Sequence, residues 1–513
     1  MSLPSSTPKF RVAICGAGIG GLVLAVTIGK FAGRDIHIDL YEAHDGITTA
    51  GAGISVMGRT MQIMEELGLY EEISRVSTEL PSSSHGSKLR KSDVPEGGFE
   101  WFQKSYGPSN MHRQHLVDIL KQHLPSECTV HLDKRLTRYV KQSPGSLILH
   151  FADGSTATTD VLVGADGIRS SVRKTLFETI DAGIIDRSRI RHYIDPSWTG
   201  TLVYRTVFPA EKLFRLDPNN VALKNFMIFC GKGKHIVSYP VSQGTQINVA
   251  AFVADDQKAG THFEGRWVSD VSLEEVEKAY EDFEPGAKSL LKCSENPSRW
   301  ALHVVNELPL STCDRVALIG DASHAMTPHF GAGAGQAMED AFVLGRLLAY
   351  PLTTLGNLPA ALKAYQDVRL PFTQFVARES ERTGSMFEFC LPGYYEGTDR
   401  SNEREEMEIL KEKLTDQWGW EREGGAVTEW LQAERQLQAN VVDTYTMNVH
   451  AYASTMNVLK KTFMLAFSAS SSAAPSSREE IPSLYTRPDH LKYDDPDGIH
   501  NARSAAHIVP LST

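Results

Sequence analysis

Two glycine-rich segments, far apart in the chain, carry residue types that bind phosphate groups. The first, GAGIGG (16–21), places Gly16, Gly18 and Gly21 in the three glycine positions of a G-x-G-x-x-G turn. The first glycine of such a turn allows a tight bend, the second lets backbone approach a pyrophosphate, and the third lets a helix pack closely. Glu42 ends the next predicted strand, where a carboxylate can accept hydrogen bonds from a ribose hydroxyl pair. The spacing predicts a dinucleotide site; the alternative is a glycine-rich turn beside an ordinary surface glutamate.

The second segment is RVALIGDASHAMTPHFGAGAGQAMEDAFVLGRLL (315–348). Its buried strand delivers Asp321 to the carboxyl end of the strand, where ligands of open α/β sheets bind. Gly331, Gly333 and Gly335 then bring bare backbone to a helix start, whose free N–H groups attract anions. VLVGADGIRSSVR (161–173) is a further strand and turn of this kind. Each of these two segments, taken alone, also fits a strand and turn of no special role.

Hydrophobic patterns predict the elements that hold these turns. The strand–turn–helix–strand order at the start of the chain is typical of a parallel α/β sheet. Between about 186 and 300, apolar segments such as GTLVYRTVFP and HIVSYPV alternate with turn residues and predict an antiparallel sheet. The earlier predicted elements are a strand at 10–15, a helix ending near 31, a strand at 36–42, helices at 58–75 and 113–124, and two strands joined by an Asp153-Gly154 turn.

Composition narrows the class of partner. Of the 513 residues, 41% are hydrophobic and 22% charged, and the net charge is -11. Nucleic acids and anionic membranes are bound by clustered cations, so this balance argues against both. Six scattered cysteines without a C-x-x-C pair predict free thiols in a reducing compartment, which favours the cytoplasm, and no metal site.

One uncharged stretch, Val12 to Gly29, resembles a signal peptide or a short membrane span. Glycines interrupt it in the way that a strand-to-helix turn requires. We therefore reject the targeting interpretation, and we expect no membrane span.

Taken together, GAGIGG with Glu42, VGADGIR (163–169) and GDASHAMTPHFGAGAGQAMED (320–340) resemble the signatures of the group A flavin-dependent aromatic monooxygenases. The agreement is closest to the salicylate hydroxylase-like branch, which includes fungal enzymes that dearomatise phenols. Local agreement at AGAGI (50–54), MHR (111–113), VYR (203–205) and HIVSYPV (235–241) extends the resemblance over about residues 10 to 380.

The resemblance implies a fold of class α/β plus α+β. It predicts a Rossmann-like FAD-binding domain, an inserted antiparallel-sheet substrate domain and a C-terminal helical region. The predicted parts are FAD-binding segments at 8–80, 110–185 and 301–355, an excursion at 81–109, the β-rich substrate domain at 186–300, the helical region at 356–467, and a low-complexity linker and tail at 468–513.

The same resemblance implies tight, non-covalent FAD and gives roles to single positions. The glycines of GAGIGG would hold the pyrophosphate and Glu42 the adenosine ribose. Arg113 matches an arginine that reaches FAD; without the resemblance it would be an ordinary charge on a helix surface.

Further positions complete the implied cofactor site. Ala52 and Gly53 match a loop that passes close to FAD. Asp166, with Gly167, matches a motif near the pyrophosphate and the nicotinamide path, and Asp321 would face the ribityl or pyrophosphate region. Gly333 and Ala334 would present N–H groups to the flavin ring.

Arg205 and Tyr239 are the implied catalytic residues, because matching positions of the dearomatising relatives bind and activate a phenol. A guanidinium is always charged and stabilises a phenolate oxygen, and a tyrosine hydroxyl can hydrogen-bond to it. The alternative for both is a structural role on a strand. His329 stands next to the flavin glycines and could relay protons; it and His235 are weaker candidates, since a lone histidine is more often a satisfied polar residue.

The implied reaction is hydroxylation of a phenolic ring through a flavin hydroperoxide, with dioxygen and transient NADH or NADPH as co-substrates. Only one G-x-G-x-x-G unit with a ribose acid is present, which favours transient docking of the nicotinamide cofactor. Two alternatives remain, an epoxidase of prenylated metabolites on the same scaffold and a non-catalytic FAD-scaffold carrier. The predicted partners are a small aromatic phenol and dioxygen, and a homodimer stays open.

Overall fold

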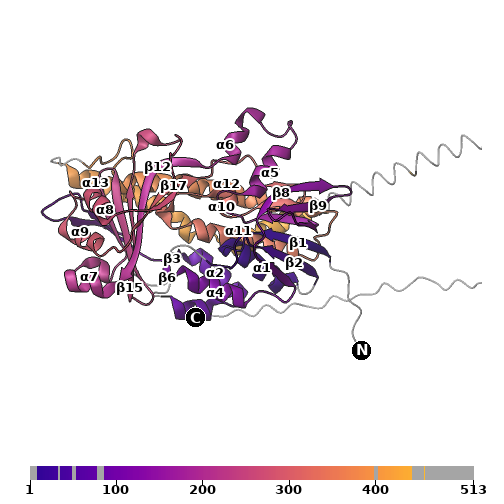
Figure 1. Ribbon diagram of the computed structural model, residues 1–513, viewed down its shortest axis with the longest axis horizontal. Coiled ribbons are helices and arrows are strands. Elements are labelled where there is room, and N and C mark those ends of the chain that lie inside the picture. The colour runs from indigo at the N-terminus through magenta and orange to yellow at the C-terminus, as the bar shows by residue number, and fades with distance from the viewer. Residues whose placement is uncertain are drawn as a thin grey trace, which may run out of the picture. The chain divides into compact units, whose positions relative to one another are not determined.

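The computed structural model describes residues 9–32, 35–48, 53–77, 86–397, 402–441 and Met456. The chain divides into two units, Met1–Tyr445 and Thr446–Thr513, and the elements described below all belong to the first (Figure 1). The predicted linker and tail at 468–513 lie outside the described residues.

The first predicted strand lies inside a six-stranded sheet. β1 (Phe10–Cys15) pairs in parallel with β2 (Ile36–Tyr41) and with β11 (Val161–Gly164). Its continuous apolar run suits this place, because both faces of a parallel strand between two neighbours are buried. Alternate side chains of β1 pack into two different core clusters, one on each face. The outer strands are β19 (Val316–Leu318) and the antiparallel β18 (Thr312–Cys313) beyond β11, and β7 (Cys128–His131) beyond β2.

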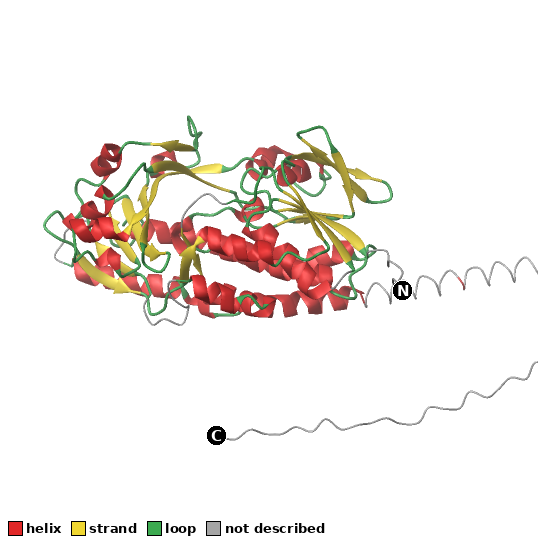
Figure 2. Cartoon of the chain, turned by 60° about the horizontal axis from the view of Figure 1, so that its bottom comes forward, coloured by secondary structure: helices red, strands yellow, loops and turns green. Residues whose placement is uncertain are grey.

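Helices cover one face of this sheet. α1 (Ile19–Ala32) packs along α11 (Gly333–Ala349), and both carry mostly buried residues, as expected of helices that are apolar on most sides. The long helices run together beneath the sheet in Figure 2. The same core cluster includes residues of α2 (Gly58–Leu67), α3 (Tyr70–Val76) and α4 (Arg113–Gln122).

The opposite face of the six-stranded sheet packs against a second layer of mixed structure. α5 (Ser171–Thr179) and a three-stranded antiparallel sheet share its core cluster. The short α6 (Ile190–Ile194) lies beside α5. The three strands, in sheet order, are β10 (Thr156–Thr159), β9 (Ser146–Phe151) and β8 (Leu136–Gln142).

The β-rich region forms an eight-stranded sheet at the other end of this unit (Figure 1). Neighbouring strands are antiparallel except for one parallel pair, β13 with β4. One side of the sheet is covered by α7 (Ala210–Leu216), α8 (Leu273–Ala279) and α9 (Pro285–Lys292). The sheet order is β16 (Val268–Asp270), β17 (Ser298–Val304), β12 (Ser197–Pro209), β15 (Gln246–Val253), β14 (Lys234–Val241), β13 (Met227–Gly231), β4 (Lys88–Lys91) and β5 (Phe99–Gln103).

The segment 81–109, predicted as an excursion, contains two strands in its described part. Its strands β4 and β5 extend the eight-stranded sheet, because β4 pairs with β13 far along the chain. The segment then leads into a two-stranded ribbon of β3 (Gly53–Val56) and β6 (Ser109–His112). This ribbon contacts β14 and so connects the helical side of the molecule to the larger sheet.

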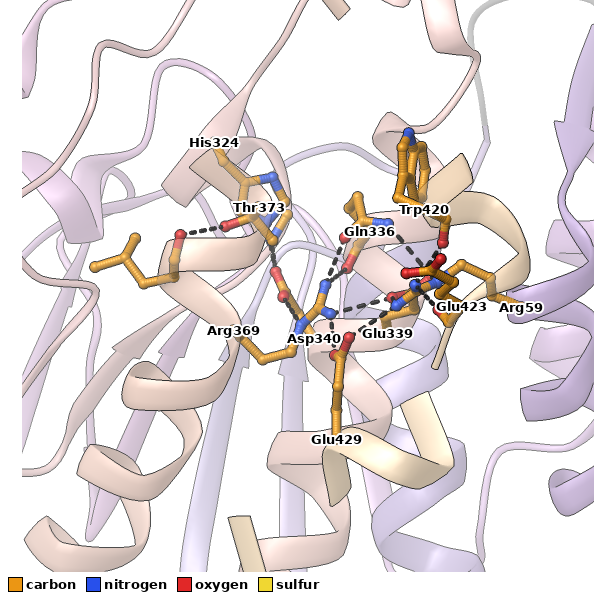
Figure 3. Close-up of polar contacts among 12 residues, drawn as sticks. Arg59, His324, Gln336, Glu339, Asp340, Arg369, Thr373, Trp420, Glu423 and Glu429 are labelled. Carbon is orange, nitrogen blue, oxygen red and sulfur yellow. Dashed lines mark hydrogen bonds and ion pairs between the residues drawn. The ribbon is translucent and has the colours of Figure 1, made fainter. Parts of the chain in front are cut away.

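The C-terminal region is helical as predicted over its described residues. α12 (Leu358–Phe387) contacts strands of both large sheets, and α13 (Glu403–Gln417) and a helix at 426–441 follow. Figure 3 shows how a buried cluster of charged side chains fastens the last of these helices to α2, α11 and α12.

The mixed α/β architecture with a C-terminal helical region confirms the predicted fold class. Within the described ranges, no helix is both long enough and apolar enough to cross a membrane.

Candidate active site

The three glycines of the turn after β1 have two roles: two of them allow close packing, and one leaves backbone open. Gly16 has φ +107°, and a Cβ there would lie 2.2 Å from the carbonyl oxygen of Ala165. A Cβ on Gly21 would lie 2.0 Å from the carbonyl oxygen of Gly16. These two glycines let the turn pack directly on the end of β11 and let α1 start against the turn. Gly18, in contrast, has no atom within 4 Å of its Cβ position, so its bare backbone is open to a ligand.

Glu42 lies beside this turn, directly after β2. Its carboxylate accepts hydrogen bonds from the backbone N–H groups of Ala17 and His44, both at 3.0 Å. The carboxylate is half-buried at the outer edge of the turn.

Asp166 and Gly167, after β11, have different surroundings. The Asp166 carboxylate accepts from the N–H groups of Ser171 and Val172, at 2.7 and 3.1 Å, and so caps the start of α5. Burial raises its pKa. Gly167, with nothing within 4 Å of its Cβ position, is the member of the pair that lines the cavity described next.

A cavity of about 530 Å³ lies between the six-stranded and eight-stranded sheets. Gly18, Gly167, Asp321, Gly333 and Ala334 line one wall, so three segments far apart in sequence meet there. Asp321 begins the short helix α10 (Asp321–His324), separated by two residues from the end of β19. Gly333 and Ala334 are the first residues of α11, whose N–H groups therefore face the cavity region.

The facing wall comes from the larger sheet and the ribbon. Its lining includes apolar and aromatic side chains, among them Val203, Phe226, Val237 and Trp300. Such a lining excludes water from a bound aromatic ring. Gly53 of β3 also lines the cavity, whereas Ala52 lies outside the described residues.

Arg113, the first residue of α4, reaches the same cavity. Its Nε is buried and has no hydrogen-bond partner among the described residues. An unpartnered guanidinium donor and the open backbone at Gly18 and Gly167 fit an acceptor-rich ligand with a pyrophosphate. The donor set therefore fits the FAD that the resemblance implies.

Arg205 of β12 and Tyr239 of β14 both line the sheet side of the cavity. The Arg205 guanidinium lies 5.2 Å from the Trp300 ring centroid. Among the described residues, no carboxylate forms an ion pair with Arg205. Burial lowers the pKa of Arg205; the neighbouring Tyr239 raises it and the positive charge of Arg113 lowers it.

The Tyr239 hydroxyl is held at the junction of sheet and ribbon. Its ring stacks on Phe226 with centroids 4.8 Å apart. A Cβ added to Gly53 would lie 2.5 Å from the hydroxyl oxygen, so glycine is needed for this approach. Burial raises the pKa of Tyr239. The positive charge of Arg205, a hydrogen bond with Ser55, and the positive charge of Arg113 each lower this pKa. The hydroxyl stays protonated and can donate to a bound oxygen.

Sequence reasoning missed Lys104 and Trp418, which also line the cavity. Lys104 pairs with the buried Glu421 and lies 4.6 Å from the Trp418 ring centroid. Lys104 follows β5 and Trp418 follows α13, so only the tertiary fold brings them together. The aromatic-rich run WFQKSYG (101–107) was the available signal.

The two histidine candidates differ in whether they reach the cavity. His329 lines the cavity beside the start of α11, and His235 is buried behind it. Glu42, Gly16, Gly21 and Asp166 do not line the cavity; they shape the turns at its edge.

A parallel sheet with a glycine turn, facing an antiparallel sheet across a shared cavity, defines an FAD-dependent oxidoreductase fold. The chain belongs to the FAD binding domain family, whose model matches residues 9–380. This confirms the family resemblance drawn from the sequence motifs.

Individual relatives are similar over most of their length. The chain is 34% identical over 402 residues to a salicylate hydroxylase of Pseudomonas putida, covering 75% of this chain and 87% of that protein. It is 31% identical over 433 residues to a 6-methylsalicylate 1-monooxygenase of Aspergillus terreus, covering 81% and 90%. A solved salicylate hydroxylase substrate complex superimposes with a TM-score of 0.71 at 30% identity, covering 84% of this chain and 98% of that one.

Proposed function

We propose that this protein is an FAD-dependent, NAD(P)H-consuming monooxygenase that hydroxylates a salicylate-like or alkylated resorcylic phenol. One observation carries the proposal. A single cavity joins the open backbone of three separated segments to Arg205 and Tyr239 on the facing sheet. The similarity to a salicylate hydroxylase and a 6-methylsalicylate monooxygenase supports the choice of a phenolic substrate.

On this proposal, Gly18, Gly167, Asp321 and the start of α11 hold FAD, with Arg113 donating to it from the ribbon side. When bound, FAD carries electrons from NAD(P)H to dioxygen and so supplies the oxidising chemistry. The glycines Gly16 and Gly21, with Glu42, fix the turn at the edge of the site.

Arg205 and Tyr239 act on the substrate. The permanent charge of the guanidinium favours the phenolate over the phenol, and the tyrosine hydroxyl donates to the same oxygen. A phenolate ring is richer in electrons and reacts faster with an electrophilic oxygen. The apolar lining orients the ring and excludes water.

Location and assembly belong to the same proposal. The six cysteines are all free, which supports a reducing compartment such as the cytoplasm. A homodimer is the simplest assembly to test, by light scattering of the flavin-loaded protein across a range of concentrations.

The test is a panel of phenols and their methyl ethers offered to the FAD-loaded protein. Salicylates, hydroxybenzoates and resorcylaldehydes would be supplied with NADH or NADPH, and products identified by mass and by position on the ring. We expect NAD(P)H consumption matched by a ring-hydroxylated product from at least one phenol, and none from its methyl ether. Equal hydroxylation of the ether, or an epoxide from a prenylated compound and no phenol product, would contradict the proposal.

A further inference from the structure

One row of residues across the eight-stranded sheet lies along the cavity and ends in a cation. The row runs from Tyr239 through Phe226 and Ser87 to Lys104, in the registers that join β14, β13, β4 and β5. The backbone N–H of Lys104 donates to the carbonyl oxygen of Ser87 at 2.9 Å, and all four residues line the cavity. Neighbouring strands lie about 4.8 Å apart, so the backbone of Lys104 lies roughly 14 Å across the sheet from that of Tyr239.

Lys104 keeps hydrogen-bonding capacity at its end of the row. Its side chain is 8% exposed and pairs with the buried carboxylate of Glu421. The ring centroids of Tyr106 and Trp418 both lie 4.6 Å from its Nζ. An ammonium group carries three N–H donors, and Glu421 is the only hydrogen-bond acceptor that Lys104 meets among the described residues. Donors therefore remain for a ligand in the cavity.

Glu421 balances the charge of Lys104 from behind. It does not line the cavity, and its Oε2 also accepts the Tyr106 hydroxyl at 2.6 Å. The Lys104–Glu421 pair has no net charge. A carboxylate brought to Lys104 would lose its hydration and meet the negative charge of Glu421, whereas an uncharged acceptor avoids both costs.

The space between Tyr239 and Lys104 suits the body of an aromatic ring. Phe226 lies between them in the row, with its ring stacked on that of Tyr239. Pro108 and Trp418 add apolar surface to the cavity lining. This part of the cavity therefore has an aromatic middle and a polar group at each end.

We propose that Lys104 is a specificity-determining residue, which donates to an uncharged oxygen on the side of the substrate ring away from the hydroxyl held by Arg205 and Tyr239. This inference rests on the proposed function and names its substrate class: a phenol with a second, uncharged polar group, a carbonyl or a hydroxyl, remote from the first. Glu421 is a positioning residue, because it acts on the substrate only through Lys104. A carboxylate next to the reacting hydroxyl, as in salicylate, is outside the reach of this selection.

The test compares ligands that have the same shape and differ by one charge. The oxidised, FAD-loaded protein is titrated with 4-hydroxybenzamide and 4-hydroxybenzoate, and with the two 3-hydroxy isomers, and the change in flavin absorbance gives each dissociation constant. A mildly acidic pH is used, at which the benzoates are ionised and Lys104 is charged; burial lowers the pKa of Lys104 and the charge of Glu421 raises it.

We expect the wild type to bind the amide at least about tenfold more tightly than the benzoate in at least one isomer pair, the size of one hydrogen bond to a charged group. Glu421→Gln should reverse this preference, because the charge of Lys104 is then unbalanced. A role of Glu421 in the fold alone would weaken both ligands together and would not exchange their order.

Two further variants complete the comparison. Lys104→Met/Glu421→Gln removes the whole pair without leaving a buried charge, and it should bind the two members of each ligand pair equally. Lys88→Met is the matched control: Lys88 lies on β4 beside the row, outside the cavity lining, and pairs with Glu100 at 3.8 Å. It should keep the wild-type preference. Equal binding of amide and benzoate by the wild type, or the wild-type preference in Glu421→Gln or in the double variant, would overturn the assignment.

Failure of this inference is distinguishable from failure of the proposed function. Ligand binding to the oxidised protein needs no turnover, and product formation with NAD(P)H is measured separately on the panel of phenols. The absence of a ring-hydroxylated product from every phenol contradicts the proposed function. Product formation without the amide preference contradicts the role of Lys104 alone.

Discussion

At the scale of single residues, the proposed function gives Arg205 and Tyr239 two different parts in holding a phenolate. Arg205 supplies a charge that does not depend on pH, in a wall where no described carboxylate pairs with it. Tyr239 supplies a hydroxyl that burial keeps protonated. Gly53 lets the ribbon approach this hydroxyl, so a residue without a side chain contributes to the geometry.

We expect alanine substitution to act differently at Gly18 and at Gly16: it should weaken FAD binding at Gly18 and destabilise the fold at Gly16. Gly18→Ala places a Cβ where no protein atom lies within 4 Å, so the apo-protein should keep its stability within about 0.5 kcal/mol. Its FAD affinity should fall, because the methyl group occupies the space open to the pyrophosphate. Gly16→Ala should destabilise the fold by roughly 1–3 kcal/mol, since φ is +107°. Urea unfolding and FAD titration of both apo-variants provide the measurement; an unchanged FAD affinity in Gly18→Ala would remove Gly18 from the cofactor site.

Glu388 predicts a pH dependence of stability. Its pKa is raised from 4.5 to about 7 in the folded protein, so between these pH values the folded state binds more protons than the unfolded state. The free energy of unfolding should therefore fall as pH rises through this window, by up to about 3 kcal/mol from this group. Glu388→Gln should flatten that part of the profile, and the exposed Glu405→Gln should not. Urea unfolding at several pH values with saturating FAD measures it; parallel profiles for wild type and Glu388→Gln would show that this carboxyl is not shifted.

At the scale of elements, the sequence predicted what local patterns determine and could not predict pairing between strands far apart in the chain. The strand, glycine turn and helix at 10–32 were predictable because an apolar run and spaced glycines determine them locally. The sheet pairing of β4 was not, since its partner β13 lies far along the chain and nothing within 88–91 identifies it. Asp166 shows the same limit within the site: its cofactor role stays a prediction, and its capping of α5 could not be predicted because it depends on where the helix starts.

The buried pair of Lys104 and Glu421 joins the end of β5 to the turn after α13, with side chains 8% and 1% exposed. Lys104→Met leaves a buried carboxylate without its cation, so it should destabilise the protein by roughly 3–5 kcal/mol. The double variant Lys104→Met/Glu421→Gln should lose less than Lys104→Met alone, because no buried charge remains. Urea unfolding of the three proteins tests this, and a double variant less stable than the single one would contradict it.

At the scale of the whole described unit, charged side chains rather than apolar contacts alone hold the C-terminal helix in place. Arg369 contacts Asp340 at 2.9 Å and Glu339 at 3.1 Å, and Arg59 contacts Glu429 at 2.7 Å (Figure 3). Asp340 also accepts the N–H of Gly320, directly before the cavity residue Asp321. The network therefore connects residues beyond the family match to the turn at Gly320 and Asp321 that lines the cavity.

Glu429 is the member of this network that the C-terminal helix contributes. Glu429→Gln leaves Arg59 and Arg369 with one carboxylate fewer, which should cost roughly 1–3 kcal/mol, because each buried arginine loses one charged contact and keeps Glu339. The exposed Glu405→Gln is the matched control and should change stability by no more than about 0.5 kcal/mol. Thermal and urea unfolding of the FAD-loaded proteins measure the difference. Equal stability of the two variants would show that the helix is held by its apolar face alone.

The central claim, that Arg205 and Tyr239 activate a bound phenol, is tested most directly by the ratio of hydroxylated product to NAD(P)H consumed. The ratio is measured for wild type, Arg205→Ala, Arg205→Lys and Tyr239→Phe, each checked for full flavin content. We predict that Arg205→Ala keeps FAD but loses hydroxylation by on the order of 10²–10³, with reducing equivalents released as hydrogen peroxide. Arg205→Lys should recover little, since a compact ammonium does not reproduce the guanidinium fork, and Tyr239→Phe should be less severe than Arg205→Ala. Wild-type turnover and coupling in both Arg205→Ala and Tyr239→Phe would contradict the account.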